Sequence, residues 1–209
     1  MGDWSSDVCS SDPMEIWSEP AYPTQHQGPA IVIGSGPKVL DEFAAVYPAQ
    51  GAAVLFLCEN MAHVIAGARA ERDHVCSAHL GFWDDPANAA LLYIKHFAVS
   101  ERDRTRSSGY DYRWHGLKGG TSSLFGVRLA RHLGFAPVLG IGMPLAPGGH
   151  APGSRPDPAS PFATGNMNGI EHYRAAWREA KARGDLEGVY SVSGSIWRSE
   201  ERRVGKECR

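Results

Sequence analysis

The sequence predicts one α/β domain in which helices flank a mostly parallel sheet. Short continuous apolar runs, which are typical of strands covered on both faces, alternate with segments whose apolar residues recur at helical spacing. This alternation favours parallel strands joined by crossover helices. Since the chain shows no internal repeat and no linker that would divide it, we expect a single domain of the Rossmann-like kind.

The first strand, turn and helix are predicted between residues 30 and 48. The run 30–33 is wholly apolar and ends at Gly34. Pro37 suits the first turn of a helix, because its fixed φ fits there and its missing N–H is not needed. Apolar residues then recur at helical spacing as far as Pro48. These features predict a strand, a tight glycine turn and a helix.

Further strands and helices follow the same pattern. One helix is predicted to begin with Thr121 or Ser122 as its cap and to end at Gly134. Another is predicted from a cap at Asn168 to Gly184. Continuous apolar runs predict further strands at 52–58, 74–78, 90–94, 136–141 and 189–192. Irregular structure is expected where no such pattern occurs, at 13–29, 100–120 and 143–167.

The composition is that of a globular protein without a membrane segment. The 209 residues are 43% hydrophobic and 21% charged, with a formal net charge of -2. The near-neutral charge gives no bias towards nucleic acid, and no apolar run approaches the roughly 18 residues that a spanning helix needs. No secretory signal is recognisable at the start of the chain. We therefore expect a cytoplasmic protein, and the oligomeric state stays open. The small-molecule nucleotide that we expect as its ligand is predicted by the glycine turns described below.

Both ends of the chain look foreign to the rest. Residues 1–12 and 198–209 resemble translated sequencing-adapter sequence, as found at the ends of metagenomic reading frames, with genuine polar tails as the alternative. The predicted domain is therefore 13–197, and the extent of the natural protein on either side of it stays open. Outside these ends only Cys58 and Cys76 remain, in strand-like runs that predict reduced, buried thiols and no zinc site.

A glycine turn after the first strand is a candidate phosphate site, because ligands of open α/β sheets bind beyond the carboxyl ends of the strands. Its residues are Gly34, Ser35, Gly36 and Pro37. Lys38 is unexpected in the first turn of a helix, and a bound anion would compensate for its charge. A plain turn with a surface lysine is the alternative. Val39 stands where the dinucleotide fingerprint has its last glycine, so NAD and FAD are not expected.

A second anion or ribose contact is predicted where the later helix begins, at Gly119, Gly120, Thr121 and Ser122. An ordinary helix cap is the alternative. The loop 100–120, which precedes this helix, contains arginines and aromatic residues interrupted by acidic residues. We expect it to be a lid or a solvated loop rather than a nucleic-acid groove.

Three further residues are candidates for the same cleft. His150 lies in a glycine-rich loop, where its imidazole is a candidate general base. Ser77 and His79 follow another predicted strand and are expected to line the cleft. For each histidine, a surface or packing role is the alternative. No metal-ligand spacing occurs, so no metal site is expected.

The most distinctive pattern is GGTSSLFGVRLARHLGF at 119–135, continued by VLGIGMP at 138–144. It resembles a family of uncharacterised bacterial and phage proteins. That family groups with archaeal 6-hydroxymethylpterin diphosphokinase-like proteins and is similar in layout to sialyltransferases of the Campylobacter type. The resemblance extends to 33–37, 58–60 and 73–79.

The resemblance implies a Rossmann-like domain that holds a nucleotide or nucleotide sugar. It places the turn 34–37, Asn60, Thr121 and Ser122 around the nucleotide and makes His150 the base. The chain departs from the family in having Lys38 where a serine is common. The catalytic loop of the sialyltransferases is also not recognisable between positions 147 and 168.

Three functions are consistent with these features. The first is a nucleotide-binding, glycosyltransferase-like transferase that uses a nucleotide sugar as its substrate. The sequence identifies no cofactor for it. The second is a diphosphokinase acting on a pterin-like alcohol, which would need magnesium held by a carboxylate such as Glu59 or Asp73. The third is a non-catalytic protein of phage or mobile-element origin that retains the fold.

Overall fold

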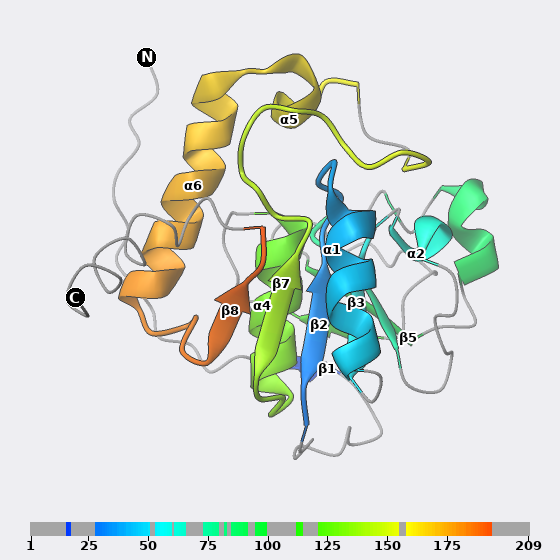
Figure 1. The fold of residues 1–209 in the computed structure, drawn as a ribbon, viewed down its shortest axis with the longest axis vertical. Coiled ribbons are helices and arrows are strands. Elements are labelled where there is room, and N and C mark those ends of the chain that lie inside the picture. The colour runs from blue at the N-terminus through cyan, green and yellow to red at the C-terminus, as the bar shows by residue number, and fades with distance from the viewer. Residues whose placement is uncertain are drawn as a thin grey trace.

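The computed structural model confirms an α/β domain built on a mostly parallel sheet (Figure 1). It describes residues 16–17, 28–50, 53–59, 61–65, 73–79, 82, 85–91, 95–99, 112–114, 121–154 and 158–193. The sheet has eight strands in the order β1-β6-β5-β4-β3-β2-β7-β8. Neighbouring strands are parallel except for β1 and β6, which pair antiparallel.

The strands are β1 (Ile16–Trp17), β2 (Ala30–Ile33), β3 (Val54–Cys58), β4 (His74–Ser77), β5 (Lys95–Val99), β6 (Tyr112–Trp114), β7 (Val138–Ile141) and β8 (Val189–Ser191). The helices are α1 (Val39–Val46), α2 (Met61–Val64), α4 (Ser122–His132), α5 (Pro161–Thr164) and α6 (Met167–Ala182), with short 3-10 helices η1 (Tyr47–Gln50) and η2 (Pro86–Leu91).

Apolar side chains of β2 fill a core on each face of the sheet. Ala30 and Val32 lie in the core that α4 and α6 cover, whereas Ile31 and Ile33 lie in the core that α1 and α2 cover. All four residues are 0% exposed, and each buried isoleucine contributes roughly 2 kcal/mol. Figure 1 shows α1 and α4 on opposite sides of the sheet. The continuous apolar run therefore marks a strand covered on both faces, as predicted.

The caps of the two long helices refine the predicted boundaries. Thr121 caps α4, because its side chain accepts a hydrogen bond from the Leu124 amide. The prediction that Asn168 caps the last helix is wrong. The cap is Asn166, whose side chain accepts from the amides of Asn168 and Gly169. Asn168 lies within the first turn of α6 and is a donor to that cap.

Three further predictions, one for a strand and two for irregular stretches, are also wrong. The predicted strand 90–94 begins inside η2, and the strand is β5, which lies further along the chain. A short apolar run does not distinguish a strand from a buried helical turn, which explains the error. The predicted irregular stretches 100–120 and 13–29 contain β6 and β1, which pair with each other at one edge of the sheet.

The strand order places a topological switch point beside β2. From β2 the chain passes to β3 on one side, whereas β7, reached much later, lies on the other side. The connections that leave β2 and β7 therefore diverge, which opens a crevice at their carboxyl ends. Within the part of the chain that the structure describes, no helix has the length and apolar content to cross a membrane.

A largely buried ion pair joins α4 to the turn after α6. The Arg128 side chain is 5% exposed and pairs with Asp185, whose side chain is 32% exposed. Asp185→Asn is expected to lower the free energy of unfolding by about 2 kcal/mol, because it leaves a buried guanidinium without a charged partner. Urea denaturation would measure the loss. The control is Glu179→Gln, which breaks the exposed pair with Arg183 and is expected to cost under about 0.5 kcal/mol. Equal losses would contradict the prediction.

Candidate functional site

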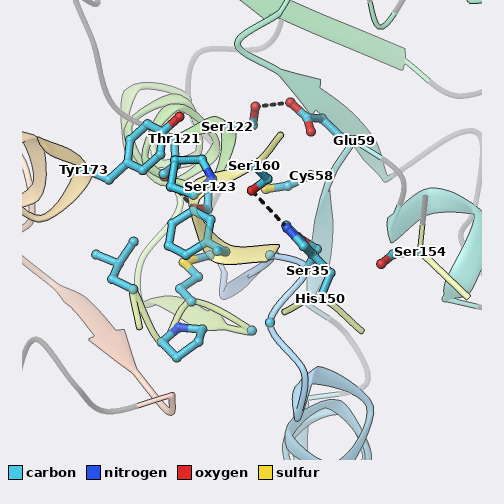
Figure 2. A pocket seen from close by; sticks show the side chains of 18 of the residues that line it. Ser35, Cys58, Glu59, Thr121, Ser122, Ser123, His150, Ser154, Ser160 and Tyr173 are labelled. Carbon is cyan, nitrogen blue, oxygen red and sulfur yellow. Dashed lines mark hydrogen bonds between the residues drawn. The ribbon is translucent and has the colours of Figure 1, made fainter. Parts of the chain in front are cut away.

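A cavity of about 610 Å³ lies at the switch point (Figure 2). The turn after β2, the start of α4 and the loop after β7 contribute to its lining, together with residues that follow β3 and β4. Polar side chains of the lining include Ser35, Glu59, His79, Thr121, Ser122, Ser123, His150, Ser160 and Tyr173. The rule that ligands of open sheets bind at this edge therefore located the crevice correctly.

The glycine turn after β2 is locked against the loop after β7. The Gly34 amide donates to the Ile141 carbonyl at 2.9 Å, and the Gly36 amide donates to the Gly142 carbonyl at 2.8 Å. A Cβ added to Gly34 would lie 2.6 Å from the Gly142 oxygen, and one added to Gly142 would lie 2.3 Å from the Gly34 oxygen. These glycines allow two backbones to meet, and the amides of Gly34 and Gly36 are already hydrogen-bonded within the protein.

Pro37 and Lys38 do not belong to the described cavity lining. Both are exposed, and Lys38 occupies the N-cap position of α1. The first turn of α1 carries Asp41 and Glu42, which supply the negative charge that a helix start favours. Lys38 thus needs no bound anion to explain it, which agrees with the alternative of a surface lysine.

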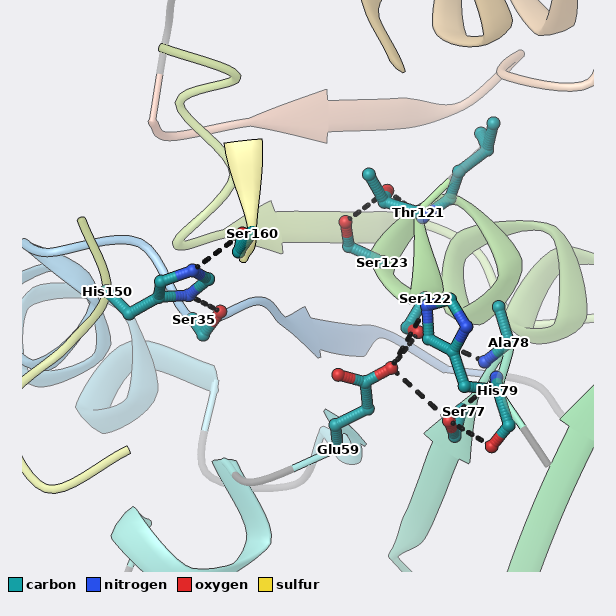
Figure 3. A network of polar contacts seen from close by, with 11 residues as sticks. Ser35, Glu59, Ser77, Ala78, His79, Thr121, Ser122, Ser123, His150 and Ser160 are labelled. Atoms are coloured by element: carbon teal, nitrogen blue, oxygen red, sulfur yellow. Dashed lines mark hydrogen bonds and ion pairs between the residues drawn. The ribbon is translucent and has the colours of Figure 1, made fainter. Parts of the chain in front are cut away.

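His150 joins the glycine turn to the far side of the cavity (Figure 3). Its Nδ1 lies 2.8 Å from Ser35 Oγ, and its Nε2 lies 3.2 Å from Ser160 Oγ. The Ala151 amide donates to the Ser35 carbonyl at 2.7 Å, which fastens the same loop. Burial lowers the pKa of His150 below its ordinary value, although the negative charge of Glu59 acts in the opposite direction. The imidazole is therefore neutral at pH 7 and can accept a proton.

A second polar cluster surrounds Glu59, which follows β3. Its Oε1 accepts a hydrogen bond from Ser122 Oγ, and Ser77 Oγ lies 3.2 Å from the same oxygen. The Ser122 hydroxyl in turn accepts from the Ala78 amide at 3.0 Å. His79 Nε2 lies 3.9 Å from this Glu59 oxygen. Ser77 therefore supports the site from behind, whereas His79 lines the cavity.

The start of α4 faces the cavity through three hydroxyl residues, Thr121, Ser122 and Ser123. Thr121 Oγ1 lies 2.7 Å from Ser123 Oγ and 3.3 Å from Trp177 Nε1, in addition to capping the helix. Ser123 is thus turned to the side of the helix away from Glu59. The predicted contacts Asn60, Gly119 and Gly120 lie outside the described residues.

Aromatic and apolar side chains form the remaining wall. Phe162 and Tyr173 stack with ring centroids 5.5 Å apart, and the Phe162 ring meets His150 edge-on at 6.1 Å. Cys58 also lines the cavity, but burial raises the pKa of its thiol, as it does for Cys76. Both thiols are therefore protonated and unsuited to nucleophilic attack.

Sequence reasoning missed several residues of this site. Ser160, Phe162 and Tyr173 lie in or beside α5 and α6, far along the sequence from any predicted strand end. No local sequence pattern marks them as site residues. Glu59 was not missed: it directly follows a predicted strand, where the rule for strand ends expects site residues, and it is also a candidate magnesium ligand. The other carboxylate considered, Asp73, precedes β4 at the opposite end of the sheet and is fully buried, where it accepts a hydrogen bond from the Leu55 amide. Asp73 is therefore remote from the cavity lining.

Groups of three or more metal-ligating side chains do not occur among the described residues. Comparison of the chain with protein-family models, curated proteins and solved structures gave no match.

Proposed function

We propose that this protein is a nucleotide-binding transferase with glycosyltransferase-like chemistry. The observation that carries the proposal is the position of His150, a neutral imidazole that faces the same cavity as the start of α4. The cavity also lies at the switch point, where nucleotides bind in other open α/β sheets. The Phe162–Tyr173 wall offers an aromatic surface for a nucleobase.

His150 serves as the general base in the proposed reaction. An acceptor hydroxyl replaces one of its two serine partners and gives its proton to the freed ring nitrogen. The acceptor oxygen then forms a bond to the anomeric carbon of the sugar, and the bond from that carbon to the phosphate oxygen breaks. The nucleotide leaves with the electron pair of that bond. First-turn amides of α4 and the Ser123 hydroxyl would stabilise its negative charge.

A diphosphokinase acting on a pterin-like alcohol is the second candidate. It is favoured by the presence of a carboxylate, Glu59, in the cavity lining, because magnesium is bound by one or two carboxylates together with substrate phosphates. Asp73 is no longer a candidate ligand, since it lies at the other end of its strand. The third candidate, a non-catalytic phage or mobile-element protein, predicts no nucleotide binding.

A thermal-shift panel of CMP, UDP, GDP, ATP and a pterin, each with and without magnesium, tests the proposal. Stabilisation by CMP or UDP, followed by turnover of the matching nucleotide sugar, is the expected result. Stabilisation by ATP only with magnesium would favour the diphosphokinase, and no response at all would favour the non-catalytic protein.

The panel is repeated with a variant that fills the cavity. Ser160→Trp places a bulky side chain in the lining and is expected to abolish the response. Ala163 is exposed on α5, the helix that begins after Ser160, and does not line the cavity. Ala163→Trp is therefore expected to keep the response to the nucleotide. A response that survives in Ser160→Trp would place nucleotide binding elsewhere.

A further inference from the structure

Glu59 brings a negative charge into a cavity that the proposed function fills with a nucleotide. It is the one carboxylate in the described lining, which includes neither lysine nor arginine. His79 Nε2 lies 3.9 Å from Glu59 Oε1, and the His79 side chain is 68% exposed to solvent. A phosphate beside Glu59 would therefore be repelled, and no lysine or arginine of the described lining offsets that repulsion.

The two oxygens of the Glu59 carboxylate have different surroundings. Oε1 holds the contacts to Ser77, Ser122 and His79. Oε2 has no hydrogen bond to another described residue. Figure 3 shows Oε1 turned towards the Ser77–Ser122 cluster and Oε2 towards the side where Ser35 and His150 lie. Described side chains thus fix one oxygen, and no described residue uses the lone pairs of the other, which points towards the cavity.

The backbone holds Glu59 in this orientation. Its φ is +50°, an uncommon value for a residue with a side chain. Its amide donates to the Cys76 carbonyl at 2.9 Å, and its carbonyl accepts from the Ala62 amide at 3.2 Å. The residue is therefore tied to β4 on one side and to α2 on the other, and the orientation of Oε2 is built into the fold.

We infer that Glu59 binds a pair of neighbouring hydroxyls on the ligand and keeps phosphate away from this end of the cavity. The inference rests on the proposed function and adds the orientation of the nucleotide. Hydroxyls are neutral donors that a carboxylate accepts without a counter-charge, as Glu59 already does from Ser122. Glu59 also directly follows β3, the second strand of the unit that begins at β2, where an acid of other nucleotide-binding α/β folds receives ribose hydroxyls. The diol is that of the ribose or of the transferred sugar.

Glu59→Gln separates this role from a general effect on the cavity. Wild type is expected to bind CMP or UDP at least roughly tenfold more tightly than the 2′,3′-dideoxy form of the same nucleotide. The dideoxy form lacks the hydroxyls and so loses the hydrogen bond to the charged Glu59 carboxylate. Glu59→Gln is expected to weaken the ribonucleotide by a similar factor and to leave the dideoxy nucleotide unchanged. Calorimetry with both forms measures this coupling.

A matched control is Glu42→Gln. The Glu42 carboxylate also accepts two hydrogen bonds, from the Gly142 amide and Ser193 Oγ, but it does not line the cavity. This variant is expected to keep the preference for the ribonucleotide. If the diol belongs to the transferred sugar instead, Glu59→Gln weakens the nucleotide sugar while CMP and UDP are unaffected, and the inference still holds.

Other outcomes would overturn the inference. One combines two results: the wild-type protein binds the ribo and dideoxy forms equally, and Glu59→Gln binds the nucleotide sugar as tightly as wild type does. Another is binding of both forms that requires magnesium and disappears in Glu59→Gln, which would make Glu59 a cation ligand. In both cases nucleotide binding itself stands. A wild-type protein that binds no nucleotide would remove the proposed function together with this inference.

Discussion

Gly142→Ala is expected to lower the free energy of unfolding by about 3 kcal/mol. The added Cβ would lie 2.3 Å from the Gly34 oxygen and 2.6 Å from Val39 Cγ2, so the two backbones would have to separate. The φ of +65° at this position adds strain for any residue with a side chain. Such a loss is a large part of the total stability of a domain. Urea denaturation of the purified variant would measure it.

Two further alanine variants divide this effect into its causes. Gly184 has φ +80° but open space around its Cβ position, so Gly184→Ala is expected to cost about 1 kcal/mol from backbone strain alone. Gly34→Ala meets the Gly142 oxygen at 2.6 Å without a left-handed φ and is expected to cost about 2 kcal/mol. If Gly142→Ala cost no more than Gly184→Ala, the close contact of the two loops would be disproved.

His150→Gln is expected to reduce kcat by about 100-fold to 10,000-fold, the usual contribution of a general base. The turnover assay uses the nucleotide sugar that the ligand panel identifies and follows release of the nucleotide. Because burial lowers the pKa of His150, the wild-type rate should stay high at pH 7 and fall as the pH drops through that lowered pKa. The variant should lose this acid limb. An unchanged acid limb would assign the base to another residue.

His150 should also affect stability in acid. The unfolded chain binds a proton on this residue more readily than the folded protein does, since the folded pKa is lowered. The free energy of unfolding should therefore decline as the pH falls below the ordinary histidine pKa of about 6.5, and less so in His150→Gln. His172→Gln, on the surface of α6, serves as the control for both measurements.

The fold and part of the site could be predicted because they depend on local patterns. The run 30–33, the glycine break and the helix after it set the first unit, and the rule for strand ends then placed the turn, Glu59 and His150 at one edge. Ser35 and His150, which are 115 residues apart, do meet there. Runs without a helical or strand period, as around β5, could not be assigned by the same reasoning.

The remaining features depend on contacts between distant segments. The pattern at Gly34 and Gly36 predicts a phosphate loop, and in the structure the two amides donate to the carbonyls of Ile141, the last residue of β7, and of Gly142. A turn that receives a ligand and a turn that receives another backbone need the same small residues, so the pattern cannot separate them. The position of Glu59 depends likewise on Ser122, 63 residues later, which no spacing rule anticipates.

The two rims of the crevice differ in how they are held. Between β2 and β7, main chain contacts main chain, so that rim is rigid. On the opposite rim, main-chain hydrogen bonds fix Glu59 to β4 and α2, but the start of α4 is joined to Glu59 through the Ser122 side chain, which can rotate without moving a strand. A change in ligand size would thus be accommodated at the start of α4. Variants that alter specificity at little cost in folding should arise there, while the glycine side tolerates almost none.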